Sequence, residues 1–273
     1  MHGLTRYLKS NYSFYIMMVP ALIYIIGYKF VPLFGLTIAF KDFNIFASDS
    51  IFKSIMESPW VGLAHFKRIF SSADFYDVLT NTLILSAYKI VLLFPLPIIM
   101  AILMNELRSR MFKRSVQTFI YLPHFLSWVV VYGIFFTLLN SEGVVNIALS
   151  ALGQQKKSFF MDQSIFRGLL VFTEGWKETG WSTVVYMAAI TGIDEVLYEA
   201  SELDGANRYQ QMIHITLPEI LPVVALMLVM RVGKIMEAGF EQVLVMYNPT
   251  VYEVADILQT YVYRMGIGQM GYS

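Results

Sequence analysis

The stretch EASELDGANRYQQMIHITLP, residues Glu199–Pro218, decides the fold of this chain. It is polar, is interrupted by Gly205 and lies between two long apolar segments. Charged side chains are costly in the hydrocarbon core of a bilayer. We therefore expect the stretch on one side of a membrane, fixed by the helices that flank it. That is the layout of a docking element for a soluble partner.

The composition agrees with a membrane protein. Of the 273 residues, 56% are hydrophobic and only 15% are charged, whereas soluble domains typically carry about 25% charged residues. A net charge of +0 argues against nucleic acid as a partner, because nucleic-acid binding favours a basic surface. The absence of cysteine excludes disulfides and thiolate metal sites. The four histidines form no metal-binding pattern, so we expect no metal site.

A helix needs roughly 20 mainly apolar residues to cross the hydrocarbon core, and five blocks of the sequence meet this requirement. The sequence therefore predicts an all-α, polytopic helical bundle. Prolines inside the first two blocks predict kinked helices. The five predicted spans are about Phe14–Phe40, Leu79–Met104, Val116–Leu139, Ile165–Ile193 and Glu219–Tyr247.

Basic residues near the spans predict the orientation. The short loop Asn105–Ser115 carries Arg108, Arg110, Lys113 and Arg114, and the amino-terminal tail carries Arg6 and Lys9. Both lie on one side if the first two spans cross out and back. The amino terminus is therefore expected in the cytoplasm, and counting spans forward places residues 199–218 on the cytoplasmic side as well.

The polar stretch and the residues just before it, about 194–218, predict a rigid coupling element. Apolar residues on one face predict a short helix over Asp194–Leu203, which Gly205 ends because glycine reaches left-handed backbone angles at little cost. A second short helix is expected over about Ala206–Ile213. Pro218 is expected to begin the fifth span, since a proline at a helix start loses no hydrogen bond.

Charged residues inside the fourth and fifth spans predict either ion pairs between helices or a polar translocation path. Both interpretations stay open, and they are compatible. Except for the neighbours Lys177 and Glu178, the charged residues of each span are three or four positions apart, so each set is expected near one helix face. Aromatic residues favour a path that binds sugar rings, although Trp and Tyr also populate membrane interfaces. The predicted path residues are Glu174, Trp176, Lys177, Glu178, Trp181, Arg231, Lys234, Glu237 and Glu241, with Lys89 as a further candidate.

The spacing of residues 199–218 resembles the EAA loop of the membrane subunits of ATP-binding-cassette (ABC) importers. That motif is Glu-Ala-Ala, three residues, Gly, nine residues, Ile, one residue and Leu-Pro. This sequence matches the spacing throughout and departs only at Ser201, which replaces the second Ala. The resemblance implies that this loop inserts into a groove of an ATPase subunit. The residues to which it assigns this coupling role are Glu199, Ala200, Ser201, Gly205, Ile215, Leu217 and Pro218.

Further stretches, among them Gly239-Phe240-Glu241-Gln242 and Tyr247-Asn248-Pro249, resemble carbohydrate-uptake permeases of the maltose and glycerol-phosphate type. Within that family the chain is similar to the lipoprotein-associated subgroup linked to polysaccharide fragments. The resemblance implies an oligosaccharide substrate. Arg231 and Lys234 favour an acidic one, while the carboxylates of the same region argue the other way.

The resemblance also implies the remaining parts of the machine. They are a second, homologous permease subunit, two ATPase subunits and an extracellular solute-binding protein, in a bacterial inner membrane. The pattern GxxxxGK[ST] of a P-loop is absent, so we expect ATP and Mg to be used by the partner ATPases. The chain itself is expected to bind no cofactor and to have no catalytic residues. Residues 1–273 are expected to form a single permease domain, with a sixth span expected after residue 273.

Two other classes of protein are alternatives. An intramembrane enzyme would need a nucleophile with a base, or a metal set, and His124 stands alone near a span start. An ion-coupled secondary transporter is compatible with the buried charges. It would not need residues 199–218, and its halves should show repeat symmetry, which this sequence does not.

Overall fold

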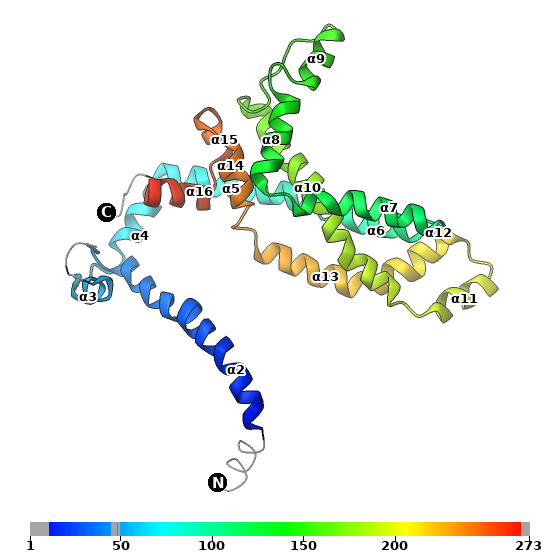
Figure 1. Cartoon of the computed structure of the whole chain (residues 1–273). Coiled ribbons are helices and arrows are strands. Elements are labelled where there is room, and N and C mark those ends of the chain that lie inside the picture. Colours follow the sequence, from blue (N-terminus) through cyan, green and yellow to red (C-terminus); the bar gives the residue numbers. More distant parts are fainter. Residues whose placement is uncertain (1–10, 45–47, 49, 269–273) are drawn as a thin grey trace. The chain divides into compact units, whose positions relative to one another are not determined.

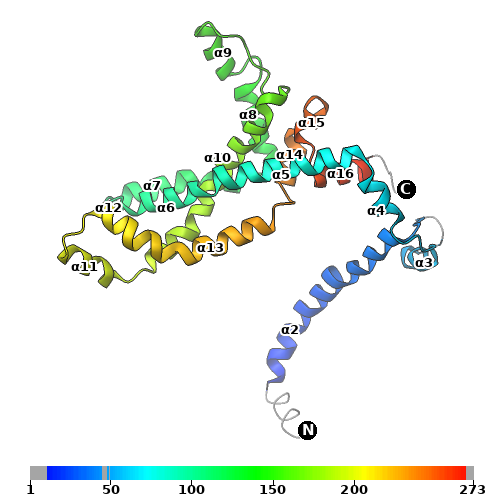
Figure 2. The same cartoon turned by 180° about the vertical axis from the view of Figure 1, so that it is seen from behind.

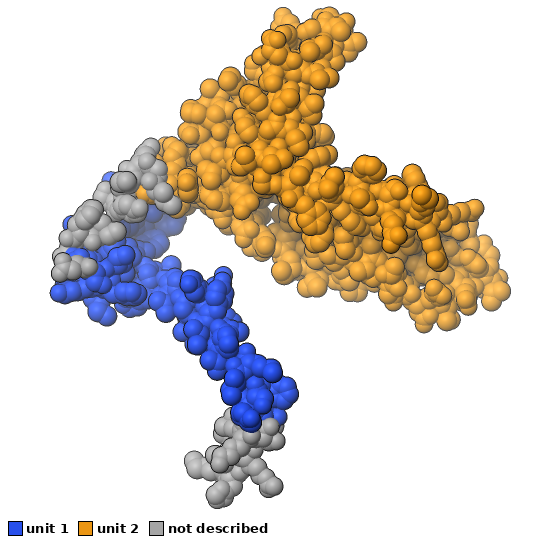
Figure 3. Space-filling view, in the orientation of Figure 1, with its two compact units in different colours: residues 1–72, 270–273 blue, residues 73–269 orange. Residues whose placement is uncertain are grey.

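The computed structural model describes residues 11–44, 48 and 50–268, which form helices joined by loops. This confirms the predicted all-helical class. The chain divides after Ser72 into two compact units, shown in different colours in Figure 3. The tail residues Arg6 and Lys9 and the Gly271-Tyr272-Ser273 end lie outside the described residues.

Unit 1 contains the first predicted span. Its α-helix continues through a π-helical turn into a 3₁₀ helix, and Pro32 stands where the 3₁₀ helix begins. None of the side chains of these three elements is buried, so their apolar surface is available to lipid or to another subunit. The elements are α2 (Tyr12–Ile25), η1 (Ile26–Phe30), η2 (Val31–Phe40), α3 (Ile51–Glu57) and α4 (Ala64–Phe70).

Unit 2 holds the remaining helices. They are α5 (Ala73–Leu93), α6 (Pro95–Asn105), α7 (Arg110–Tyr121), η3 (Leu122–Phe125), α8 (Trp128–Leu139), α9 (Val144–Ala151), α10 (Gln163–Thr191), α11 (Glu195–Leu203), α12 (Arg208–Gln211), η4 (Met212–Thr216), α13 (Leu217–Gly233), α14 (Phe240–Met246), η5 (Pro249–Val251), α15 (Tyr252–Ala255), α16 (Leu258–Tyr263) and η6 (Arg264–Gly268).

The long helix α10 organises unit 2 (Figures 1 and 2). Along one half it is accompanied by α6, α7 and α13, which lead to α11 and α12 at one end of the unit. Around its other half lie α8, α14 and α15. Each half has its own apolar core. Phe166 and Leu170 belong to the core near the start of α10, and Tyr186 and Ile190 to the core near its end.

Gly180 allows α7 and α10 to approach closely. A Cβ atom at this position would lie only 1.8 Å from the carbonyl oxygen of Ile120 in α7. Any larger residue would therefore push the two helices apart.

The third predicted span, Val116–Leu139, is wrong as a single helix. Helix α7 ends at Tyr121, a 3₁₀ turn contains Pro123, and α8 begins at Trp128. Proline lacks the N–H for a helical hydrogen bond and its ring crowds the preceding turn. The Ser127 hydroxyl then caps α8 by accepting a hydrogen bond from the Val130 N–H at 3.4 Å.

The fifth predicted span, Glu219–Tyr247, is also wrong in its bounds. One continuous helix runs over Arg208–Gly233, through α12, η4 and α13. The chain then makes a linker, residues 234–239, before α14. Ala238 and Gly239 have positive φ angles of 46° and 82°, which a continuing α-helix excludes.

Among the residues that the structure describes, four helices are long and apolar enough to cross a membrane: Tyr12–Phe40, Ala73–Asn105, Trp128–Ala151 and Arg208–Gly233. Helix α10 matches the fourth predicted span within two residues at each end but is less apolar. Every 18-residue stretch of α10 contains Glu174, Lys177 and Glu178. The way in which these three charges are neutralised therefore decides whether α10 suits a membrane.

Candidate functional site

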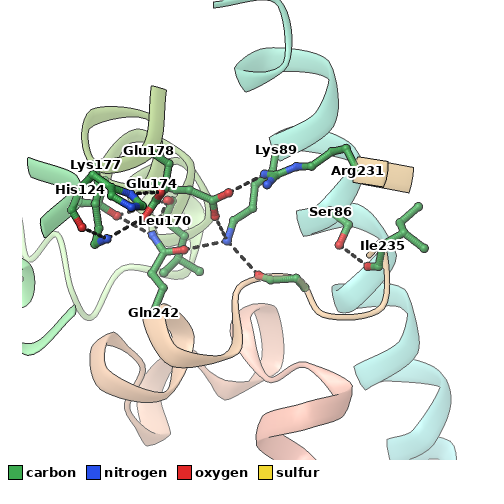
Figure 4. A network of polar contacts seen from close by, with 12 residues as sticks. Ser86, Lys89, His124, Leu170, Glu174, Lys177, Glu178, Arg231, Ile235 and Gln242 are labelled. Atoms are coloured by element: carbon green, nitrogen blue, oxygen red, sulfur yellow. Dashed lines mark hydrogen bonds and ion pairs between the residues drawn. The ribbon is translucent and has the colours of Figure 1, made fainter. Parts of the chain in front are cut away.

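Glu174 of α10 lies at the centre of a buried polar network (Figure 4). Its side chain is 8% exposed and accepts from two cations. Arg231 of α13 donates from Nη2 to Oε1 at 2.5 Å, and Lys89 of α5 contacts Oε2 at 2.5 Å. One carboxylate thus joins three helices. Glu174 and Arg231, which come from the fourth and fifth predicted spans, thus form an ion pair between helices.

A second cluster lies close by on α10 and is built around Glu178. His124 Nδ1 lies 2.7 Å from Glu178 Oε2, and Lys177 Nζ donates to Glu178 Oε1 at 2.7 Å. The His124 ring stacks on Trp181 with centroids 4.6 Å apart, and Lys177 Nζ lies 5.3 Å from the ring centre of Trp128. His124, which stands alone in the sequence, therefore has a carboxylate partner 54 residues away.

Side chains of α5 hold the linker between α13 and α14 through its backbone carbonyl groups. Ser86 donates to the Ile235 carbonyl at 2.5 Å, and Lys89 donates to the Ala238 carbonyl at 2.8 Å. Lys234 and Glu237 lie on this linker and are exposed. The predicted single helical face for Arg231, Lys234, Glu237 and Glu241 is wrong, because the helix ends at Gly233.

Two cavities adjoin the network. A cavity of about 280 Å³ lies between α6, α10 and α13, and one of about 230 Å³ lies between α5, α10 and the linker. Four charged residues line both cavities: Glu174, Glu178, Arg231 and Lys234. The structure therefore supports both interpretations of the charged residues, since Glu174 and Arg231 pair between helices and also line both cavities.

The other predicted path residues differ in position. Glu237 lines the smaller cavity only. Lys177 is buried, donates a hydrogen bond to Glu178 and lines neither cavity. Trp176 and Trp181 are 39% and 43% exposed and also line neither, so sugar stacking on them stays a prediction. Glu241 is exposed in the first turn of α14, outside both cavities.

The predicted coupling segment begins with a well-capped short helix. Asp194 caps α11 by accepting from the Val196 N–H at 3.0 Å. Gly205 ends it with a φ of 82°, and the Ala206 N–H donates to the Ser201 carbonyl at 2.9 Å, the bond of a Schellman-type helix end. Leu203 is 91% exposed, and Glu199 is exposed without a side-chain partner in the part of the chain that the structure describes.

The departure from the motif at Ser201 has a structural role. Its hydroxyl donates to the Tyr198 carbonyl at 2.8 Å and accepts from Gln211 Nε2 at 3.0 Å. Tyr198 in turn lies 2.9 Å, oxygen to oxygen, from the Thr216 hydroxyl. These contacts fix α11 to the long helix that follows, so a displacement of α11 would be transmitted to that helix.

The predicted second short helix and the predicted start at Pro218 are wrong. Asn207 and Gln210 form a capping box, and the helix that begins there continues into α13 without a break. The π-helical turn η4 directly precedes Leu217 and Pro218, and such a wider turn accommodates a residue that cannot donate to the preceding turn. Ile215 is half-buried, whereas Ala200, Leu217 and Pro218 are exposed.

Sequence reasoning did not identify Gln242. Its Nε2 donates to the Leu170 carbonyl at 2.6 Å and to the Thr173 hydroxyl at 2.7 Å, and its Oε1 accepts from Lys89 at 2.7 Å. The signal available in the sequence was an amide side chain at the start of the apolar stretch that follows Glu241. The structure buries this side chain fully, and a buried polar side chain needs hydrogen-bond partners.

Comparison with known proteins assigns the family. Residues 94–271 match the family described as binding-protein-dependent transport system inner membrane component. The chain belongs to this family, and it is a permease subunit of an ABC importer and a multi-pass protein of the inner membrane. ATP hydrolysis takes place in partner ATPase subunits. The family decides against the ion-coupled secondary transporter.

Individual relatives match nearly the whole chain. It is 43% identical to the polygalacturonan/rhamnogalacturonan transport system permease protein YteP of Bacillus subtilis (strain 168), over 99% of this chain and 83% of that protein. It is 42% identical to Protein LplB of the same organism, over 97% of this chain and 82% of that protein. These matches confirm the predicted resemblance to permeases for polysaccharide fragments.

Solved structures agree. The fold is similar to a chain in the crystal structure of a bacterial ABC transporter involved in the import of the acidic polysaccharide alginate. The TM-score is 0.89 at 39% identity, covering 98% of this chain and 89% of that chain. A second crystal structure shows a bacterial alginate ABC transporter in complex with an alginate pentasaccharide-bound periplasmic protein, with a TM-score of 0.88 and 38% identity.

Proposed function

We propose that this chain is the permease subunit through which an ATP-driven importer moves an acidic oligosaccharide into the cytoplasm. The observation that carries the proposal is the 43% identity, over 99% of the chain, to a permease named for polygalacturonan and rhamnogalacturonan. The relative associated with the acidic polysaccharide alginate supports the same chemistry. Two exposed or half-exposed cations, Arg231 and Lys234, line both cavities.

Within this function, the two cavities form part of the substrate path. Glu174, Glu178, Arg231, Lys234 and Glu237 supply its polar lining. The guanidinium of Arg231 matches a carboxylate in a bidentate geometry, and its side chain is 41% exposed even while it binds Glu174. Lys177, Trp176, Trp181 and Glu241 act around the path, by holding Glu178 or by presenting surface beyond the cavities.

Residues 194–218 form the contact with an ATPase subunit. The exposed Leu203 and the unpaired carboxylate of Glu199 offer an apolar and a charged anchor on one short helix. Gly205 allows the turn that follows, and Ser201 and Tyr198 connect the contact to α13. The complete importer contains a second, homologous permease, two ATPases that use ATP and Mg, and an extracellular solute-binding protein that delivers the substrate.

Both units of the chain serve one permease domain, with the amino terminus and residues 194–218 in the cytoplasm. The basic residues of the Asn105–Ser115 loop support this orientation. Glu106 of that loop lies 3.1 Å, oxygen to nitrogen, from Arg208 Nη1, so the basic loop and the coupling segment lie on the same side of unit 2.

Growth of a deletion strain on a panel of oligosaccharides tests the proposal. Loss of growth on oligomers of polygalacturonan or alginate, with growth on neutral oligosaccharides retained, is the expected result. Purification of the tagged chain from its native membranes should yield an ATPase and a second permease. Growth of the deletion strain on acidic oligomers equal to that of its parent strain would contradict the proposal. Transport by this chain alone would contradict it as well.

A further inference from the structure

Lys89 is a buried cation whose three protons are all used. Its side chain is 3% exposed. The ammonium contacts Glu174 Oε2 at 2.5 Å, the Ala238 carbonyl at 2.8 Å and Gln242 Oε1 at 2.7 Å (Figure 4). An ammonium group has three donors, so none is left for a substrate. Lys89 therefore acts on other residues rather than on a ligand of its own.

The two cations that share Glu174 differ in accessibility. The Arg231 side chain is 41% exposed, against 3% for Lys89, and Arg231 lines both cavities whereas Lys89 lines only the smaller. A carboxylate that enters either cavity therefore meets Arg231. If Arg231 turned to it without Lys89 present, Glu174 would remain as an uncompensated buried charge, which is strongly unfavourable.

We propose that Lys89 is a positioning residue for recognition of acidic substrate. It neutralises Glu174 permanently, so that Arg231 can exchange the Glu174 carboxylate for a carboxylate of the oligosaccharide. The inference rests on the proposed function and adds to it a reason for two cations on one carboxylate. Lys89 thereby determines selectivity for charge without contacting the substrate.

Lys89 also positions the second accessible cation. The linker that carries Lys234 passes through two left-handed residues, Ala238 and Gly239, an arrangement that needs support at a non-glycine residue. Lys89 supplies it at the Ala238 carbonyl. A Cβ at Gly239 would lie 2.5 Å from Lys89 Nζ, so glycine at this position permits the ammonium to reach both the linker and Glu174.

The test uses the complete importer in proteoliposomes, with its binding protein and ATP, and two forms of one oligosaccharide. These are an oligomer of galacturonic acid and its methyl ester, which differ only at the carboxyl groups, where the ester carries a methyl group and no charge. The readout is the ratio of uptake of the acid to uptake of the ester. Because the binding protein is the same for every variant, its own preference cancels when the ratios are compared.

For Lys89→Met we expect the acid-to-ester ratio to fall at least about tenfold, the scale of one lost charged hydrogen bond. The double variant Lys89→Met/Glu174→Gln removes the carboxylate that would be left unpaired. Its ratio should return to within about twofold of that of the unaltered importer. The double variant buries no unpaired charge, so it still decides the test if Lys89→Met assembles poorly.

Ser86→Ala is the matched control on α5, since it removes the other side-chain hydrogen bond to the linker and changes no charge. It should alter uptake of the acid and the ester alike. Equal loss of both substrates in Lys89→Met, or a ratio that stays low in the double variant, would overturn the inference and leave the proposed function intact. Failure of the unaltered importer to take up the acid would instead overturn the proposed function.

Discussion

Arg231 and Glu174 form an ion pair between α13 and α10, with Nη2 and Oε1 2.5 Å apart. The Glu174 side chain is buried, whereas the Arg231 side chain remains 41% exposed. The pair therefore has one fixed member and one member that can reach a ligand. Its position beside both cavities connects helix packing with substrate recognition.

Replacing Arg231 by Gln should reduce uptake of an acidic oligosaccharide by about 10- to 100-fold, because a charged hydrogen bond is lost at the cavity. Arg231→Lys keeps the charge but not the fork of donors, and it should lose less. Initial uptake rates in proteoliposomes measure both effects. Identical behaviour of the Gln and Lys variants would show that charge at this position is irrelevant.

Glu199→Lys and Gly205→Val should uncouple ATP hydrolysis from transport while leaving membrane insertion intact. Glu199 is exposed on α11, where a reversed charge affects a partner rather than the fold. A β-branched residue at the φ of 82° found at Gly205 is strained by about 1–2 kcal/mol, which distorts the contact surface. The ratio of sugar imported to ATP hydrolysed is the measurement. Normal ratios in both variants would refute the coupling role.

Ser201→Ala, in contrast, restores the residue of the motif and should leave coupling unchanged, because the contact between Tyr198 and Thr216 still links α11 to the helix that follows. It removes the hydrogen bonds to Tyr198 and Gln211, each worth about 0.5–1.5 kcal/mol. A small decrease in the thermal midpoint of the purified complex is expected, with an unaltered ratio of sugar to ATP. Uncoupling as severe as that of Glu199→Lys would instead place Ser201 in the ATPase contact itself.

Gly180→Ala should destabilise the bundle, because its Cβ would lie 1.8 Å from the Ile120 carbonyl oxygen. Overpacking of this kind costs about 1–3 kcal/mol. Gly168→Ala is the control in the same helix, since a Cβ there meets nothing within 4 Å. Thermal unfolding of the two purified variants should show a loss for Gly180→Ala only. Equal midpoints would mean that α7 and α10 can separate freely.

The sequence predicted those features that depend on local signals. Apolar blocks located the helices, and the positions of Gly205 and Asp194 located the ends of α11. The ends of α7 and α13 were missed because the length of the apolar blocks set the predicted bounds, although Pro123 follows α7 and Lys234 follows α13. Near α13, side chains of α5 hold the linker that replaces the helix: Ser86 at Ile235 and Lys89 at Ala238.

The site was also predictable only where a local signal in the sequence marks its residues. Glu174, Glu178 and Arg231 are conspicuous as charges in apolar surroundings, and the structure brings each of them to the cavities. The pairing of His124 with Glu178 and the role of Gln242 depend on contacts over 54 and 72 residues. No periodicity in the sequence reports contacts over such separations.

Uptake by the complete importer in sealed proteoliposomes decides whether this permease carries acidic oligosaccharides at the expense of ATP. We expect a labelled galacturonate oligomer to accumulate inside only when ATP is supplied on the ATPase side and the binding protein on the other. A neutral oligosaccharide of equal length should not accumulate. Accumulation without ATP, or equal accumulation of the acidic and the neutral oligomer, would contradict the proposed function.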